Sequence, residues 1–198
     1  MRRTRLATLL ILALSIGGCA TVPPAAPPAT TPTRVPDTVV LTQWVAKGRI
    51  ALASTSEGGS GSFVWQQRSE RTELAFRGPL GAGGVQIVTD GETLQLTDAA
   101  GRALDGDAAR AALQQKLGID LPLGDLRYWM LGVPAPDSAG AGVMRLDQPQ
   151  SGFRQHDWEV TYPEFKPVAG WTLPAKVNAT SGQVRVRIVV DDWQIPTP

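Results

Sequence analysis

The last part of the chain is built from short segments in which apolar and polar residues alternate. In residues 184–190, Val184, Val186 and Ile188 alternate with Arg185 and Arg187. Successive side chains of a β-strand point to opposite faces, so this period of two predicts a strand with one apolar face and one face in solvent. A chain made of such segments has to bury one side of a sheet, which favours a mainly β fold.

Similar segments recur along most of the chain. The clearest pair lies on either side of Asp90-Gly91, a hairpin signal that places Val85 and Ile87 on one face with Leu94 and Leu96. In segment 44–52 Gly48 suggests a bulge or bend, and the proline in segment 171–177 suggests an edge strand. Strands are expected over 44–52, 62–68, 72–77, 84–89, 93–97, 143–146, 157–162, 171–177 and 184–190.

Two helices are expected in the middle of the chain. Residues 107–118 favour a helix, and a second one precedes Gly132, capped by Asp125 or by the glycine before it. In the second helix Leu126, Trp129 and Met130 share one face. A weaker helix is expected over 38–44, following a possible cap at Asp37.

Strands, two helices and strands again, in that order, indicate one architecture. The 21 glycines and 16 prolines suit a protein rich in turns. The expected fold is mainly β with helices: an open antiparallel half-barrel, with a lid of short α-helices over a hydrophobic cavity.

The N-terminus has the pattern of a secretory signal. Arg2, Arg3 and Arg5 precede an apolar run over 6–16, two glycines and Cys19, the only cysteine. The run is shorter than the roughly 20 residues that a spanning helix needs. The ending resembles the lipobox of bacterial lipoproteins, which implies cleavage before Cys19 and acylation of its thiol and of the new amine. An ordinary secreted protein with a stray cysteine is the alternative.

The remaining chain is interpreted as a tether followed by one domain. Residues 1–18 are the expected signal peptide, 19–37 the lipidated cysteine with a proline-rich tether, and 38–198 a single lipoprotein-binding domain. Segment 20–37 contains six prolines, and such segments favour extended polyproline II, with a reach of up to ~55 Å.

The charge balance gives no sign of a polyanionic partner. Without the three arginines of the expected signal, the chain has 16 basic and 18 acidic residues. This balance gives no bulk reason to expect nucleic-acid binding or a polybasic contact with lipid.

Catalytic, metal and cofactor sites are not predicted. A single cysteine excludes an internal disulfide and a thiolate metal site, and His156 is the only histidine. Asp157 would point to the opposite face of a strand, so His156 is interpreted as an exposed histidine. The glycines of 81–84 lack the Lys-Ser/Thr of a phosphate-binding loop, and Asp191-Asp192 lacks a calcium loop. The expected protein is not an enzyme.

Apolar residues provide the candidate binding site. Leu80 stands alone in a Gly/Pro turn between two strands, although turn tips usually carry polar residues. Other apolar residues, several of them aromatic, could line a lipid-sized cavity or simply form a core. The predicted cavity residues are Trp65, Leu74, Phe76, Val85, Ile87, Leu94, Leu96, Trp129, Met130 and Trp158.

Several short motifs, taken in their order and spacing, resemble the LolB family of outer-membrane lipoprotein receptors. Besides the lipobox, they are Trp44-x-x-x-Gly48-Arg49-Ile50-Ala51, Phe63-Val64-Trp65-Gln66-Gln67, Gly78-Pro79-Leu80-Gly81, Leu121-Pro122-Leu123-x-x-Leu126-x-x-Trp129-x-x-Gly132-x-Pro134, and Val186-Arg187-Ile188 near Trp193. The resemblance implies a half-barrel that takes acylated lipoproteins from the periplasmic carrier LolA and inserts their acyl chains into the inner leaflet of the outer membrane. It also implies that Leu80 serves membrane insertion.

The expected location is the periplasmic face of the outer membrane, with a lipid anchor at Cys19. Under the common sorting rule of such lipoproteins, Ala20 after the cysteine, where Asp would signal retention, points to the outer membrane. We expect a monomer whose partners are LolA, acylated lipoproteins and the membrane, without nucleic acid. The main alternative is a non-catalytic lipid- or protein-binding envelope lipoprotein of the same fold. A soluble carrier and an esterase or hydrolase acting on envelope lipid are more distant alternatives.

Overall fold

The computed structural model describes residues 33–34, 41–54, 58–79, 83–117, 122–136, 144–146 and 151–196. All of them belong to one compact unit, Thr31–Pro198. Its core is one continuous cluster of buried apolar residues. A chain that begins at Ala20 therefore keeps every described strand and helix.

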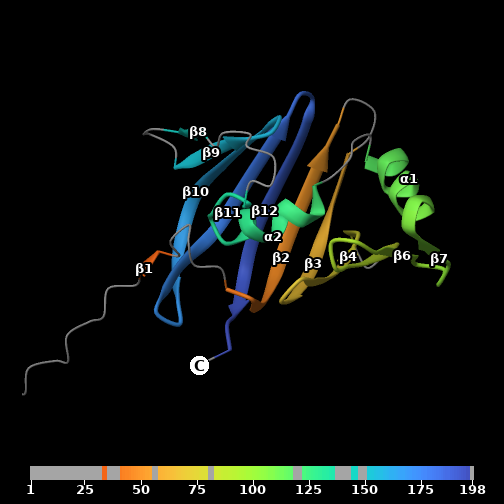
Figure 1. Cartoon of the computed structure of the whole chain (residues 1–198), viewed down its shortest axis with the longest axis horizontal. Coiled ribbons are helices and arrows are strands. Elements are labelled where there is room, and N and C mark those ends of the chain that lie inside the picture. The colour runs from red at the N-terminus through yellow and green to blue at the C-terminus, as the bar shows by residue number, and fades with distance from the viewer. Residues whose placement is uncertain are drawn as a thin grey trace, which may run out of the picture. The chain divides into compact units, whose positions relative to one another are not determined.

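Eleven strands follow one another in a single open sheet, in the order β7-β6-β5-β4-β3-β2-β12-β11-β10-β9-β8 (Figure 1). All neighbours along this path are antiparallel, and the short strand β1 pairs in parallel with β11. The strands are β1 (Thr33–Arg34), β2 (Gln43–Ala53), β3 (Gly58–Arg68), β4 (Arg71–Arg77), β5 (Gly84–Thr89), β6 (Leu94–Asp98), β7 (Ala103–Asp105), β8 (Met144–Leu146), β9 (Gly152–Gln155), β10 (Trp158–Val168), β11 (Trp171–Ser181) and β12 (Val184–Gln194).

The described residues also form two helices, α1 (Gly106–Leu117) and α2 (Leu123–Met130). Helix α2 lies over the apolar face of the sheet, and α1 lies beside β6 and β7 (Figure 1). The expected face of Leu126, Trp129 and Met130 is confirmed, because all three are buried. The open antiparallel half-barrel with helices on one face is likewise confirmed, since the described sheet runs from edge β7 to edge β8 without closing.

The hairpin predicted at Asp90-Gly91 is present, with Thr89 opposite Leu94. Asp90 stabilises the turn because its Oδ1 accepts the backbone N–H groups of Glu92 (3.1 Å) and Thr93 (2.7 Å). The backbone and hydroxyl hydrogen bonds from Thr93 lower the pKa of Asp90 below its usual value, so the carboxylate is ionised at neutral pH.

Five details differ from the sequence-based expectation. The expected helix at 38–44 is wrong where the structure describes it, because Gln43 and Trp44 begin strand β2. Residues 38–40 lie outside the described residues. The cap of α2 is also different: Pro122 precedes the helix and no side chain caps it.

Strand β11 is not an edge strand, because it lies between β10 and β12. The strand tolerates Pro174, which has no N–H, because the facing strand β10 shifts its register around Glu164 and Phe165, opposite the proline. Strand β1 falls within the segment predicted as tether, where Thr33 pairs with Trp171.

A bulge or bend was expected at Gly48, and the structure places a bulge on the facing strand β12 instead. Val190 pairs with Gly48 and Asp192 with Lys47, which leaves Asp191 as the extra residue. Lys166 stabilises this bulge because its Nζ donates to the carbonyl oxygens of Val190 and Asp191, both at 2.8 Å.

Gly48 is needed because the bulged strand approaches it closely. A Cβ atom at this position would lie 2.0 Å from the carbonyl oxygen of Val189. We expect Gly48→Ala to lower the free energy of unfolding by about 3 kcal/mol, measured by urea denaturation of residues 20–198. Gly59→Ala is the matched control on β3, since a Cβ there meets nothing within 4 Å. Equal stability of the two variants would contradict this explanation.

Candidate functional site

The apolar face of the sheet collects side chains from almost every strand. The register sets Trp193, Ala46, Trp65, Leu74, Ile87 and Leu96 side by side in one row across β12, β2, β3, β4, β5 and β6. On the other half of the same face, Val160, Val177 and Val186 are buried at 0%, 2% and 3% exposure. This surface, called here the inner face, is the candidate site.

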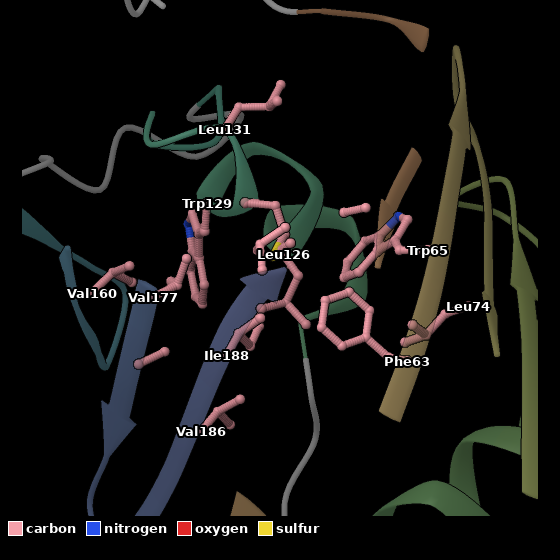
Figure 2. Packing of buried hydrophobic residues seen from close by; sticks show 14 of the residues in the cluster. Phe63, Trp65, Leu74, Leu126, Trp129, Leu131, Val160, Val177, Val186 and Ile188 are labelled. Carbon is pink, nitrogen blue, oxygen red and sulfur yellow. The ribbon is translucent and has the colours of Figure 1, made fainter. Parts of the chain in front are cut away.

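Helix α2 covers the inner face. Figure 2 shows Leu126 reaching from the helix toward Ile188 and Phe63, and Trp129 lying on the side of Val160 and Val177. The Trp129 ring packs on Trp158, with ring centroids 5.8 Å apart, and on Phe153 at 6.4 Å. A second aromatic group, in which Trp44 contacts Trp65 (5.5 Å) and Trp193 (5.3 Å), fills the β2 side.

A buried glutamine holds α2 and the segment after it in place. The Gln155 side chain, 1% exposed, accepts hydrogen bonds from Trp129 Nε1 and from the Ala135 backbone N–H, both at 2.9 Å. Its own Nε2 donates to the Ala135 carbonyl at 2.8 Å. The Tyr162 hydroxyl donates to the Trp129 carbonyl at 2.9 Å. These bonds attach both ends of segment 129–135 to β9 and β10, and they hold the C-terminal end of α2 on the inner face.

The ten predicted cavity residues come together on the inner face and on α2. Eight of them are buried: Trp65, Leu74, Ile87, Leu94, Leu96, Trp129, Met130 and Trp158. Phe76 and Val85 are only partly buried. They face each other across β4 and β5, near the end of the hairpin that leads to the turn at 78–83.

The Phe76 ring packs over Gly61 of the neighbouring strand β3, a residue that has no side chain. A Cβ atom on Gly61 would lie 2.7 Å from the Phe76 ring. Ile50 and Leu52, on the adjacent strand β2, are also only partly buried. The inner face thus has a packed part under α2 and a less covered rim at Ile50, Leu52, Phe76 and Val85.

The space under α2 is filled in this structure. A pocket of about 110 Å³ lies between the start of β2, the β3–β4 turn and α2. It is smaller than the ~300–1,000 Å³ of typical ligand pockets. Its walls include Trp44 and Arg127, and among the described residues the Nε1 of Trp44 and the Nε of Arg127 are buried without a partner. Such a small pocket with two free donors suits ordered water.

Leu80 and Cys19 lie outside the described residues. The residues on either side of Leu80 are described: Arg77 pairs with Gly84, and the Gly78 N–H donates to the Gly83 carbonyl at 3.4 Å. Gly83 has φ +64°, which favours glycine. The β4–β5 hairpin therefore continues to the base of the turn that contains Leu80.

The residues considered for catalysis are not arranged as a catalytic site. His156 lies in the β9–β10 turn, with its Nε2 3.5 Å from Asp125 Oδ2 at the surface. Asp191 forms an ion pair with Arg49 at 3.0 Å. Within the described residues, no three His, Cys, Asp or Glu side chains gather as a metal site would require. The described helices are too short or too polar for one of them to cross a bilayer.

Sequence reasoning missed Gln155, Tyr162, Trp44 and Trp193 as parts of the site. The alternation of Phe153 and Gln155, buried, with Arg154, exposed, was a signal for strand β9. Nothing in the sequence indicated that Gln155 would meet Trp129, because the two are 26 residues apart and on different elements.

An open antiparallel sheet with an apolar inner face under helices is the architecture of LolA-like half-barrels. A crystal structure of a LolA superfamily protein from Nitrosomonas europaea has the same fold, with a TM-score of 0.51, 11% identity, and coverage of 80% of this chain and 88% of that one. Residues 42–193 match the family described as outer membrane lipoprotein LolB. The chain belongs to this LolB family.

Relatives match nearly the whole chain. The outer-membrane lipoprotein LolB of Alkalilimnicola ehrlichii is 34% identical, covering 98% of this chain and 99% of its own. The LolB of Nitrosococcus oceani is 28% identical, covering 98% of this chain and 100% of its own. The family resemblance inferred from the short motifs is therefore confirmed.

Proposed function

We propose that this protein is an outer-membrane lipoprotein receptor that accepts acylated lipoproteins from the periplasmic carrier LolA and inserts their acyl chains into the inner leaflet of the outer membrane. Membership of the LolB family supports the proposal. The observation that carries it is the continuous apolar inner face, built by nine strands and covered by a helix. The alternative, a lipid- or protein-binding lipoprotein without receptor activity, is not favoured by any feature of the site.

The inner face can shield acyl chains without directional contacts. Each CH₂ group that leaves water gains about 0.8 kcal/mol, so a transfer protein has to keep the chains covered throughout. Transfer then proceeds from the carrier to this site and to the bilayer as a sequence of binding steps. No cofactor or catalytic group takes part in this scheme, and the protein acts as a monomer.

The acyl chains enter at the rim. Gln155 and Tyr162 hold α2 in place, whereas Phe76 and Val85 are only partly covered. Ala112 and Leu113 of α1 also pack against the core. The other predicted cavity residues line the space that opens when the chains displace side chains from the core. Cys19 carries the lipid anchor, which holds the protein on the periplasmic face of the outer membrane, and Leu80 enters the bilayer.

A transfer assay tests this function. LolA loaded with an acylated lipoprotein is mixed with residues 20–198 of this chain, and the complexes are separated. We expect the lipoprotein to move to this protein without added nucleotide. A lipoprotein that stays on the carrier, while circular dichroism reports a folded receptor, would contradict the proposal and favour the alternative.

The same assay locates the entrance. Val85→Glu places a carboxylate on the inner rim, so we expect acceptance to fall at least tenfold because acyl chains cannot bury a charge. Val88→Glu is the matched control: it lies on the same strand, on the opposite face, and is likewise partly buried. Equal acceptance by the two variants would exclude the rim as the entrance.

A further inference from the structure

The outer face of the sheet carries arginines at one end. Arg185 and Arg187 are exposed and alternate with buried valines on β12, and the exposed Arg77 ends β4. The turn that contains Leu80 follows Arg77 directly. All three arginines therefore lie on the outer face, at the end of the sheet from which this turn extends.

The strand register brings these arginines within reach of one another. Arg77, Ser62, Arg49 and Val189 form one row across β4, β3, β2 and β12. Arg187 is two residues from Val189, and Arg185 is two residues further. With strands about 4.8 Å apart and a rise of about 3.3 Å per residue, the three arginines span roughly 20 Å.

The neighbouring charges on this face compensate one another. Arg49 pairs with Asp191 (3.0 Å), Lys176 with Glu164 (2.6 Å) and Arg154 with Glu159 (2.6 Å). The hydrogen bond from Lys176 lowers the pKa of Glu164 and so favours its ionised form. Within the described part of the chain, Arg77, Arg185 and Arg187 have no acidic partner.

We propose that Arg77, Arg185 and Arg187 bind the anionic headgroups of a phospholipid surface and orient the sheet so that the turn at 78–83 meets the bilayer. The proposal rests on the proposed function, because it places an electrostatic contact beside the turn that is proposed to enter the bilayer. Three guanidinium groups spread over one outer face fit phosphate groups spread over a plane. Leu80, in the turn that follows Arg77, supplies an apolar contact in addition to the electrostatic one, and stable membrane binding requires two such contacts.

An acidic protein surface is the competing partner for such a face. The position of the arginines favours lipid. They lie beside the leucine-containing turn, whereas the surface around the opposite turn at Ser69 and Glu70 has its arginines paired, Arg71 with Glu73 (2.9 Å) and Arg127 with Glu70 (2.6 Å).

Vesicle binding tests the proposal directly. Residues 20–198, without cargo or carrier, are added to vesicles that contain phosphatidylglycerol or only zwitterionic lipids. We expect Arg185→Gln/Arg187→Gln to bind the anionic vesicles about 25-fold more weakly, since each basic residue contributes about fivefold. Adding Arg77→Gln weakens binding about fivefold further.

The matched control, Arg68→Gln/Arg71→Gln, removes the same charge from the opposite end of the sheet, where both arginines contact Glu73. We expect it to bind anionic vesicles like the wild type. At about 1 M salt, where the Debye length falls to about 3 Å, the wild type should bind anionic vesicles as weakly as Arg185→Gln/Arg187→Gln does.

The outcomes separate this proposal from the proposed function. Equal losses in the two double variants, or no loss in either, would overturn the lipid-binding surface. Unchanged vesicle binding by Arg185→Gln/Arg187→Gln combined with weaker acceptance from LolA would assign the face to an acidic protein. If the wild type binds vesicles as expected but accepts no lipoprotein, the receptor function fails and the lipid-binding surface stands.

Discussion

Replacing Leu80 with glutamate is expected to leave acceptance from LolA intact and to slow delivery of the lipoprotein to membranes by about 100-fold. A buried leucine side chain gains about 1.5–3 kcal/mol in an apolar environment, and an ionised carboxylate loses far more there. The base of the turn is held by the pairing of Arg77 with Gly84, so the substitution should not disturb the hairpin. Delivery is measured as transfer of a labelled lipoprotein from the receptor to vesicles.

Leu104→Glu provides the control for this experiment. Leu104, on edge strand β7, is a leucine that the structure describes as exposed, at 38% exposure. The Leu104→Glu variant should deliver the lipoprotein like the wild type. Leu80→Met, which keeps an apolar side chain, should deliver normally as well. Unaltered delivery by Leu80→Glu would remove Leu80 from the mechanism.

The second large effect is expected at Gln155. Gln155→Leu has nearly the same volume, but it leaves the Trp129 indole N–H and the Ala135 N–H and carbonyl buried without partners. Each unsatisfied buried group costs about 1–3 kcal/mol, so we expect the free energy of unfolding to fall by about 3–5 kcal/mol. Urea denaturation of residues 20–198 measures the change.

The exposed Gln95 on β6 is the matched position for this substitution. Gln95→Leu should leave the free energy of unfolding nearly unchanged, because no buried group depends on it. If Gln155→Leu were as stable as Gln95→Leu, the hydrogen bonds of Gln155 would not be what holds α2. Segment 129–135 would then need another anchor.

The sequence predicted most of the fold because alternation is a local signal. Val184, Val186 and Ile188 define the inner face of β12 without reference to any other strand, and Leu126, Trp129 and Met130 define the buried face of α2 in the same way. Whether a strand lies at an edge is not local. Pro174 is tolerated inside the sheet only because β10 changes register opposite it.

The site was predicted less completely than the fold. The ten apolar residues were identified because an inner face and a cavity wall have the same pattern. The difference between the packed region and the rim depends on which side chains α2 covers, and this is set by Gln155 and Tyr162 from distant strands. The arginines were read only as the solvent side of a strand, because their grouping depends on the register of β2, β3, β4 and β12.

The pairing of β1 with β11 limits how far the domain can move from the proposed lipid anchor. Thr33 meets Trp171 at the end of β11 opposite to the turn at 78–83. The row that contains Arg77 also contains Lys176, so the base of that turn lies four strands and five residues from Trp171, about 25 Å away. For a chain anchored at Cys19, the fourteen residues 19–32 reach about 43 Å in a polyproline conformation. This reach exceeds the separation along the sheet by about 18 Å, so the proline-rich segment is long enough for the proposed lipid anchor and the proposed membrane contact of the turn to form at the same time.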